Sequence, residues 1–391
     1  MKTITLKPKK EESVLRFHPW IFSGAVAKIS GKVDEGDLVR VEDCKGNFLG
    51  VGHYQIGSIA VRILSFSDEN IDRNFWQKKI CAAYFMRKKL KIVDVQHNNA
   101  YRLIHGEGDN LPALVVDVYG DTAILQAHSV GMYNARQILA EIIVEEIPEI
   151  KNVFCKSEGT LPFKAQIEPT DEYLIGSQTD CIAKENDILF YADWLKGQKT
   201  GFFIDQRENR SLLKTYAKNR NVLNMFCYTG GFSLYAMSGG ANLVHSVDSS
   251  AKAISLTDKN LSMNFPNDER HKSFAKDAFK FLENIDQKYD LIILDPPAFA
   301  KHRDAIKNAL QGYKRLNYRA IKQISSGGIL FTFSCSQAVS KEQFRLAVFS
   351  AAAQTGRNVK ILHQLAQAID HPINIYHPEG EYLKGLVLYV E

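Results

Sequence analysis

The chain has 391 residues, of which 45% are hydrophobic and 24% are charged, as in ordinary globular proteins of two or three domains. Its six cysteines form no CxxC pair, its histidines show no metal-ligand spacing, and no apolar run approaches the ~18 residues that span a membrane. We therefore expect a cytoplasmic protein with no disulfide framework, no metal site and no membrane partner. Residues 1–100 contain 17 Lys and Arg against 11 Asp and Glu, which indicates either a nucleic-acid partner or a solubilising surface.

Residues 1–70 are predicted to form short strands separated by glycine turns. Residues 38–42 and 59–64 alternate apolar and polar side chains, and residues 48–53 lie between them after a Lys-Gly-Asn turn. This pattern is typical of a small, strongly bent β-barrel.

Residues 71–190 are predicted to form a central α+β domain. A helix is expected at 74–91, with Trp76, Ile80, Ala83 and Leu90 near one face and basic residues on the other: Lys78, Lys79, Arg87, Lys88, Lys89 and Lys91. Residues 114–118 and 123–127 look like a strand pair, and residues 135–147 return to a helical period. Such alternation favours helices layered on a sheet.

Residues 191–391 alternate strand and helix regularly. Short apolar runs at 222–226, 243–247, 291–294 and 329–333 fit buried parallel strands, and residues 386–390 fit one more. Helices are expected between them at 232–238, 251–263, 305–324 and 341–355. The fold class expected here is α/β, a doubly wound Rossmann-like sheet.

Ligands of doubly wound sheets bind at the carboxyl ends of the strands, so the residues after each strand matter. Gly230 and Gly231 follow the first strand and allow a tight turn, although the GxGxxG dinucleotide fingerprint is absent. Asp248 ends the next strand and could accept hydrogen bonds from ribose hydroxyls, with a helix cap as the alternative. Asp277 follows a third apolar stretch and could meet an adenine amino group, or could be an ordinary loop residue.

Two further strands end in groups suited to catalysis. Asp295 leaves a very apolar strand directly before Pro296 and Pro297, and a strand stop alone would not explain the carboxylate. Cys335 lies at the carboxyl end of the last central strand, where it faces the ligand crevice. A lone cysteine is more often a small buried hydrophobe, but this position favours a functional role.

Taken in order, these features resemble class I methyltransferases, and more closely the bacterial large-subunit (23S) ribosomal RNA cytosine-5 methyltransferase family. Members of that family join an N-terminal PUA-like barrel and a central α+β domain to a Rossmann-like methyltransferase domain, which implies domains at 1–70, 71–190 and 191–391. The resemblance covers nearly the whole chain, with characteristic segments at residues 18–23, 106–112, 116–120 and 199–207.

The resemblance implies S-adenosylmethionine as cofactor and assigns roles to individual residues. The cofactor would be lined by Asn224, Phe226, Tyr228 and Gly230, with Asp248 on the ribose and Asp277 near the adenine. Its methionine end would be closed in by Thr200, Asp205, Gln206 and Arg207. The target base would face Asp295, Pro296, Pro297 and Phe299, and Cys335 would be the nucleophile.

Two departures from the family pattern stand out. Cys227 occupies the place where we expect a serine, and Ala298 follows the two prolines where some RNA cytosine-5 methyltransferases carry a second cysteine that assists product release. Product release therefore needs another base.

The sequence thus predicts an S-adenosylmethionine-dependent RNA methyltransferase that forms 5-methylcytosine in 23S ribosomal RNA through a covalent cysteine adduct. The alternatives are a methyltransferase acting on a base nitrogen, and a non-catalytic RNA-binding protein with a methyltransferase fold. A nicotinamide dehydrogenase is disfavoured because GxGxxG is missing. Ribosomal RNA is the expected partner, and the oligomeric state stays open, with a homodimer as one alternative.

Overall fold

The computed structural model describes residues 1–94, 96–162, 167–178, 182–283, 285, 287–300 and 302–391. Two compact units emerge. The first comprises Met1–Asp187, Ala192–Ile204 and Ile369–Gly380, and the second comprises Ile188–Tyr191, Asp205–Ala368 and Glu381–Glu391. The chain therefore passes from one unit to the other five times. The division into domains at residues 70 and 190 stays a prediction.

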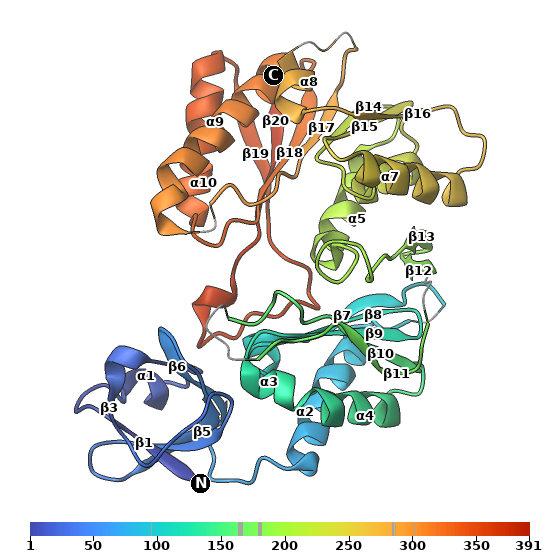
Figure 1. Cartoon of the computed structure of the whole chain (residues 1–391). Helices are drawn as coiled ribbons and strands as arrows, with labels where there is room; N and C mark the ends of the chain where they lie inside the picture. Colours follow the sequence, from blue (N-terminus) through green and yellow to red (C-terminus); the bar gives the residue numbers. More distant parts are fainter. Residues whose placement is uncertain (95, 163–166, 179–181, 284, 286, 301) are drawn as a thin grey trace. The chain divides into compact units, whose positions relative to one another are not determined.

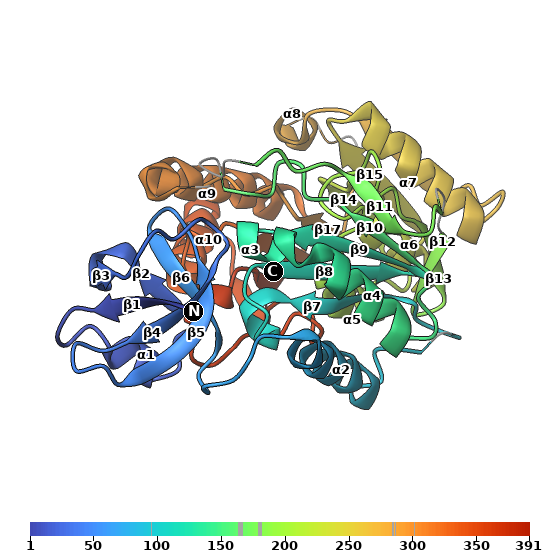
Figure 2. The ribbon, with the colours of Figure 1, turned by 60° about the horizontal axis from the view of Figure 1, so that its bottom comes forward.

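The first unit begins with a six-stranded sheet of order β2-β6-β5-β4-β1-β3, in which only β1 and β4 pair in parallel. Its strands curve round a common apolar core that includes Ile4, Val39 and Val61 (Figures 1 and 2). The strands are β1 (Lys2–Leu6), β2 (Trp20–Phe22), β3 (Val26–Ile29), β4 (Leu38–Glu42), β5 (Phe48–Tyr54) and β6 (Ile59–Ser65), with a short helix α1 (Glu12–Leu15). The predicted N-terminal β domain is confirmed.

A second sheet of the same unit has the order β11-β10-β9-β8-β7. Its strands are β7 (Ala100–His105), β8 (Leu114–Tyr119), β9 (Thr122–Ala127), β10 (Asn152–Cys155) and β11 (Glu172–Ile175). Helices α2 (Arg73–Lys89) and α4 (Arg136–Glu146) pack together on one face of it, and α3 (Val130–Asn134) contacts β9 (Figure 1). Two further short strands follow, β12 (Ile182–Glu185) at the end of this segment and β13 (Ile188–Tyr191), which belongs to the second unit.

One residue of α2 does not lie where the helical period puts it. Arg87 was expected on the basic, solvent-facing side, but its side chain is completely buried. Its guanidinium forms a two-pronged ion pair with the buried carboxylate of Asp109 and donates to the carbonyl oxygen of Asp370 at 2.7 Å. The expectation for Arg87 was wrong because its partners lie far away in the sequence.

The second unit is built on a seven-stranded sheet of order β16-β15-β14-β17-β18-β20-β19. All neighbouring strands are parallel except at β20, which is antiparallel to both β18 and β19. The strands are β14 (Asn221–Met225), β15 (Leu243–Asp248), β16 (His271–Ala275), β17 (Leu291–Leu294), β18 (Gly328–Ser334), β19 (Val359–Leu365) and β20 (Lys384–Val390). The predicted Rossmann-like α/β fold is confirmed.

Six helices among the described residues surround this sheet: α5 (Arg207–Tyr216), α6 (Gly231–Ser238), α7 (Ala251–Asn264), α8 (Ala278–Glu283), α9 (Ile306–Gln323) and α10 (Lys341–Thr355). Buried side chains of α8, α9 and α10 share one core with β14, β17 and β18, while α6 and α7 contact β15. In the described part of the chain, we find no helix with the length and apolarity needed to cross a membrane.

The strand order places a ligand crevice. The chain runs outward from β14 to β15 and β16 on one side, and continues from β17 to β18 on the other. The helices that follow β14 and β17 therefore diverge, and the space between them opens at the carboxyl ends of these strands.

Candidate active site

The turn after β14 has an unusual backbone. Phe226, Tyr228 and Gly230 all have left-handed conformations, with φ angles of 59°, 50° and 79°. Two side chains of α7 hold the turn: the Thr257 hydroxyl donates to the Tyr228 carbonyl, and the Asn260 amide donates to the Thr229 carbonyl, both at 2.9 Å. A Cβ atom on Gly230 would lie 2.8 Å from Cγ2 of Thr257, so the turn needs glycine at this position.

Asp248 lies beside this turn. Its Oδ2 accepts the backbone N–H of Tyr228 at 3.0 Å, and its Oδ1 accepts the N–H of Ser250 at 2.9 Å. The cap of α7 is Ser250, whose hydroxyl accepts the N–H of Ala253. Because each carboxylate oxygen accepts more than one hydrogen bond, Asp248 retains acceptor capacity for a ribose.

Asn224 and Asp277 make contacts that are structural in character. Asn224 is buried, and its amide donates to Ser233 Oγ at 2.9 Å. A chain of hydrogen bonds continues from Ser233 through the Ser246 hydroxyl to His271. Asp277 is exposed and accepts the backbone N–H of Lys280 at the start of α8. A role at the cofactor stays a prediction for both residues.

The segment that enters α5 approaches the end of β17. The Gln206 amide donates to Oδ1 of Asp295 at 3.1 Å, and Gln206 is itself oriented by the amide of Asn209 at 2.6 Å. Nearby in the sequence, Asp205 accepts the hydroxyl of Tyr382 at 2.7 Å. Two of the residues named from the sequence, Gln206 and Asp295, are thus brought into direct contact.

Thr200 and Arg207 have different surroundings. Thr200 belongs to the first unit, where its buried hydroxyl donates to Asp117 at 2.6 Å and lies 3.1 Å from the hydroxyl of Tyr119. Arg207 belongs to the second unit and is buried, with Glu208 as an ion-pair partner at 3.8 Å. Their predicted contacts to the cofactor stay predictions.

The ends of β17 and β18 come together at Cys335. Its thiol lies 3.9 Å from the carbonyl oxygen of Pro296, which it can approach as a weak donor. Pro296 is buried, whereas Pro297 is exposed. The ring of Phe299 packs on Tyr313 with 4.7 Å between centroids, so this aromatic side chain is anchored to α9.

The competing cysteine is in a poor position for nucleophilic attack. Cys227 is buried with its sulfur 3.7 Å from the hydroxyl of Thr257, and burial raises the pKa of this thiol to about 12. Cys335 is partly exposed. Because the thiolate is the reactive form, burial and the raised pKa disfavour Cys227 as a nucleophile.

Sequence reasoning missed two neighbours of Cys335. The hydroxyl of Tyr313 lies 2.8 Å from Ser336 Oγ and accepts the hydroxyl of Ser334 at 2.9 Å; burial raises its pKa. The buried ammonium of Lys384 donates to the Ser336 carbonyl at 2.6 Å. The available signal for Lys384 was a charged residue directly before the apolar run at 386–390.

Comparison with protein families settles the class. Residues 4–66 match a model of a PUA-like domain, and residues 161–373, more than half of the chain, match a model described as S-adenosylmethionine-dependent methyltransferase. The chain belongs to this methyltransferase family. Its cofactor is therefore S-adenosylmethionine, as the family resemblance implied.

Individual relatives agree with this family. A protein of Alteromonas mediterranea named ribosomal RNA large subunit methyltransferase I is 40% identical over 390 residues, covering 98% of both chains. A candidate S-adenosylmethionine-dependent methyltransferase from Streptococcus mutans and a candidate methyltransferase solved in complex with SAH have TM-scores of 0.84 and 0.85. Both structures are 21% identical and cover 100% of each chain, which shows a shared fold.

The residues of the methyltransferase fit this cofactor. Gly230 has a left-handed conformation in the turn after β14, and the carboxylate of Asp248 accepts a hydrogen bond from the same turn. Among the described residues, the buried Oδ1 atoms of Asn224 and Asp205 have no hydrogen-bond partner. Buried acceptors of this kind need donors, and S-adenosylmethionine supplies an ammonium group and ribose hydroxyls.

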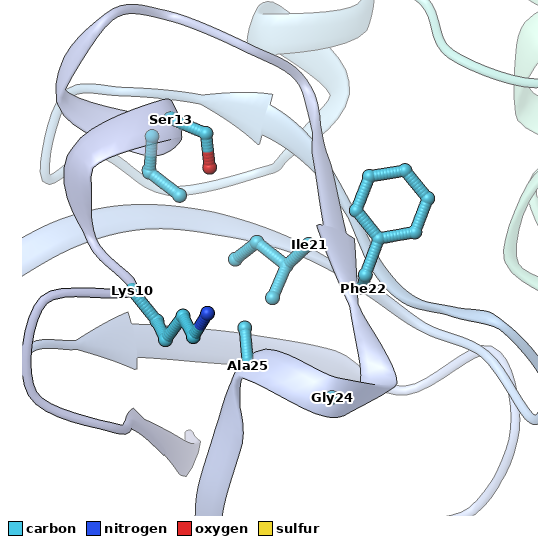
Figure 3. A pocket seen from close by; sticks show the side chains of 7 residues that line it. Lys10, Ser13, Ile21, Phe22, Gly24 and Ala25 are labelled. Atoms are coloured by element: carbon cyan, nitrogen blue, oxygen red, sulfur yellow. The ribbon is translucent and has the colours of Figure 1, made fainter.

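The PUA-like domain contains a pocket of its own, with a volume of about 320 Å³. Its floor is apolar and includes Val14 and Ile21, while Lys10 and Ser13 add polar groups (Figure 3). Phe22 stands at its edge and is 48% exposed. A largely apolar recess with a few polar groups is typical of a ligand-binding site.

Proposed function

We propose that this methyltransferase forms 5-methylcytosine in large-subunit ribosomal RNA, with Cys335 as the nucleophile. The observation that carries the proposal is the position of Cys335, a partly exposed thiol at the end of β18 that meets the Asp-Pro-Pro segment at the end of β17. The name of the Alteromonas mediterranea relative and the PUA-like domain support ribosomal RNA as the substrate.

The proposed chemistry begins at the thiol. Carbon 5 of cytosine is a poor nucleophile, and attack of the Cys335 thiolate on carbon 6 forms a C–S bond that makes carbon 5 enamine-like. Bound S-adenosylmethionine supplies an activated methyl group. A base then removes the proton from carbon 5, the C–S bond breaks, and Cys335 leaves as the thiolate.

Asp295, in its protonated form, would donate a hydrogen bond to ring nitrogen 3 and so stabilise the charge that develops on the ring. The Gln206 amide donates to the other oxygen of this carboxyl group, which keeps the side chain oriented. Asp248 would accept the ribose hydroxyls, and Asp205 would accept the ammonium group of the cofactor.

We assign RNA binding to the PUA-like domain and to the exposed basic residues of α2. The target base must be unstacked or single-stranded to reach Cys335, so the protein needs a second binding site for the RNA. The pocket at Lys10 offers one, because its ammonium can meet a phosphate while Phe22 provides a ring for stacking. No partner of the Lys10 ammonium is found in the part of the chain that the structure describes.

A trapped adduct tests this function. RNA with 5-fluorocytosine at the target position cannot lose fluorine as a proton, so the covalent species should persist after methyl transfer. A protein–RNA band stable to denaturing electrophoresis should appear only with S-adenosylmethionine. It should vanish in Cys335→Ala and persist in the matched control Cys227→Ala. Methylation by Cys335→Ala at a near wild-type rate would refute the cytosine-5 mechanism and favour methylation of a base nitrogen.

A further inference from the structure

Lys384 occupies an exceptional place for a lysine. It opens β20 directly opposite Ser334 in the antiparallel pairing with β18, and only 4% of it is exposed. Its ammonium donates to the carbonyl oxygens of Ser336 at 2.6 Å and of Tyr382 at 2.8 Å. Both carbonyls belong to segments of the second unit, and Ser336 directly follows Cys335 in the chain.

A buried ammonium is costly unless a negative charge accompanies it. The two carbonyl partners are neutral, so they satisfy donors without balancing the charge. Burial lowers the pKa of Lys384 to about 8, while the negative charges of a Cys335 thiolate and of Glu381 act in the opposite direction. A thiolate at Cys335 would therefore be a counter-charge for this lysine.

Other groups around Cys335 do not replace Lys384. Tyr313 on α9 has a raised pKa and stays a neutral phenol, shared with Ser334 and Ser336. Lys341 on α10 is about half exposed and is paired with Glu381, so its charge is already compensated. Among the described residues, Lys384 is a buried cation that interacts electrostatically with Cys335.

We propose that Lys384 is a positioning residue that keeps Cys335 ionised and fixes the strand end that carries it. This inference deepens the proposed function and rests on Cys335 as its nucleophile. A cation beside a thiol favours the thiolate, and the bond to the Ser336 carbonyl holds the backbone next to the sulfur. The effect is present while the lysine is charged and is lost as the pH rises through the pKa of Lys384.

The ionisation of Cys335 can be measured without RNA or S-adenosylmethionine. The full-length protein is alkylated with iodoacetamide over a pH series, and mass spectrometry follows the peptide that contains Cys335. The exposed Cys44 is the internal reference. We expect the midpoint of the Cys335 profile to rise by about one pH unit or more in Lys384→Gln, a tenfold change in ionisation, and to stay near wild type in Lys384→Arg.

The design separates electrostatic from structural effects. A looser strand end would change the limiting alkylation rate at high pH, whereas loss of the cation moves the midpoint. Glutamine keeps a donor for the carbonyls, and Lys384→Met serves as a second neutral variant if Lys384→Gln does not fold. Lys360→Met removes an exposed lysine of β19 that is paired with Glu391; it is the matched control and should leave the midpoint unchanged.

An unchanged midpoint in a folded neutral Lys384 variant overturns the inference. The proposed function is judged separately, by methylation in Cys335→Ala. If the alkylation profile shifts but Cys335→Ala still methylates RNA, Lys384 does promote ionisation of Cys335, but Cys335 is not the nucleophile. A shifted profile together with a slower methylation rate in Lys384→Gln supports both.

Discussion

The backbone of the turn after β14 is strained. Two non-glycine residues, Phe226 and Tyr228, adopt left-handed conformations within three positions of each other. Such conformations cost about 1–3 kcal/mol each and persist where surrounding contacts impose them. Here Thr257, Asn260 and Asp248 bind the turn through hydrogen bonds to its backbone, so contacts within the protein impose the strained shape.

The carboxylate of Asp248 provides a test at this scale. In Asp248→Ala the ribose hydroxyls would lose their acceptor and the turn would lose its bond at Tyr228, so S-adenosylmethionine affinity should fall by about 1–3 kcal/mol. Isothermal titration calorimetry measures this directly. Cys335→Ala is the control and should bind with wild-type affinity, because its sulfur is assigned to the RNA base. Equal affinities in the two variants would contradict the pocket assignment.

At the scale of elements, the sequence predicted best those helices and strands whose bounds are set by their own residues, through caps or a continuous apolar run. The helix expected at 341–355 has these bounds because Ser340 and Gln343 form a capping box and Gly356 ends it in a left-handed conformation. The strand at 291–294 is equally exact, since all four residues are buried. In contrast, β19 alternates irregularly, with exposed polar residues beside β20, and carries no clear strand period.

The candidate site divides in the same way. The apolar runs mark where each strand ends along the chain, so the residues that follow these ends could be predicted: Gly230, Asp248, Asp295 and Cys335. Arg87 and Lys384 could not, because their burial depends on partners that only the fold supplies. Asp109 is 22 positions from Arg87, and Ser336 is 48 positions from Lys384.

The buried pair on α2 should carry a large share of local stability. Arg87→Met leaves the carboxylate of Asp109 buried without its cation, which should lower the free energy of unfolding by about 3–5 kcal/mol. Urea denaturation measures the loss. Arg73→Met is the matched control on the same helix, where an exposed ion pair with Glu145 is removed, and should change the midpoint little. Equal effects would show that burial of the pair is unimportant.

The pocket of the PUA-like domain should contribute to RNA binding through charge. In Lys10→Gln we expect weaker binding of single-stranded ribosomal RNA segments, and a plot of log affinity against log salt that is less steep by about 0.7, because one phosphate contact is lost. Fluorescence anisotropy at several salt concentrations gives both quantities. Lys32→Gln removes an exposed lysine paired with Asp34 and is the control. If both variants behave alike, the pocket does not contact RNA.

The whole molecule should respond to mild acid through its buried histidines. Burial lowers the pKa values of His53, His128 and His271 to about 4 each, below the value of about 6.5 in an unfolded chain. Between these values the unfolded state binds more protons, so stability should be complete above pH 6.5 and decline as the pH falls towards 4.

Urea denaturation between pH 7.5 and 5 tests this response while most carboxylates stay ionised. The midpoint should fall with decreasing pH, and the slope of midpoint against pH should be shallower in His53→Gln, which removes one of these groups. The slope is the informative quantity, because His53 packs against Gly131 and its replacement also changes the midpoint itself. A wild-type midpoint independent of pH would contradict the burial of these imidazoles.

The five passages between units have a consequence for synthesis. Residues 369–380 belong to the first unit, where the Asp370 side chain accepts the N–H of Arg102 and its carbonyl accepts from Arg87. A ribosome makes these residues only after nearly all of the chain, although domains usually fold in the order in which they emerge. Until these residues are made, the nascent first unit therefore lacks the hydrogen bonds that Asp370 accepts from Arg87 and Arg102. The first unit, whose residues are translated first, can therefore complete its fold only when residues 369–380 have been made. A chain truncated before residue 369 would lack part of both units.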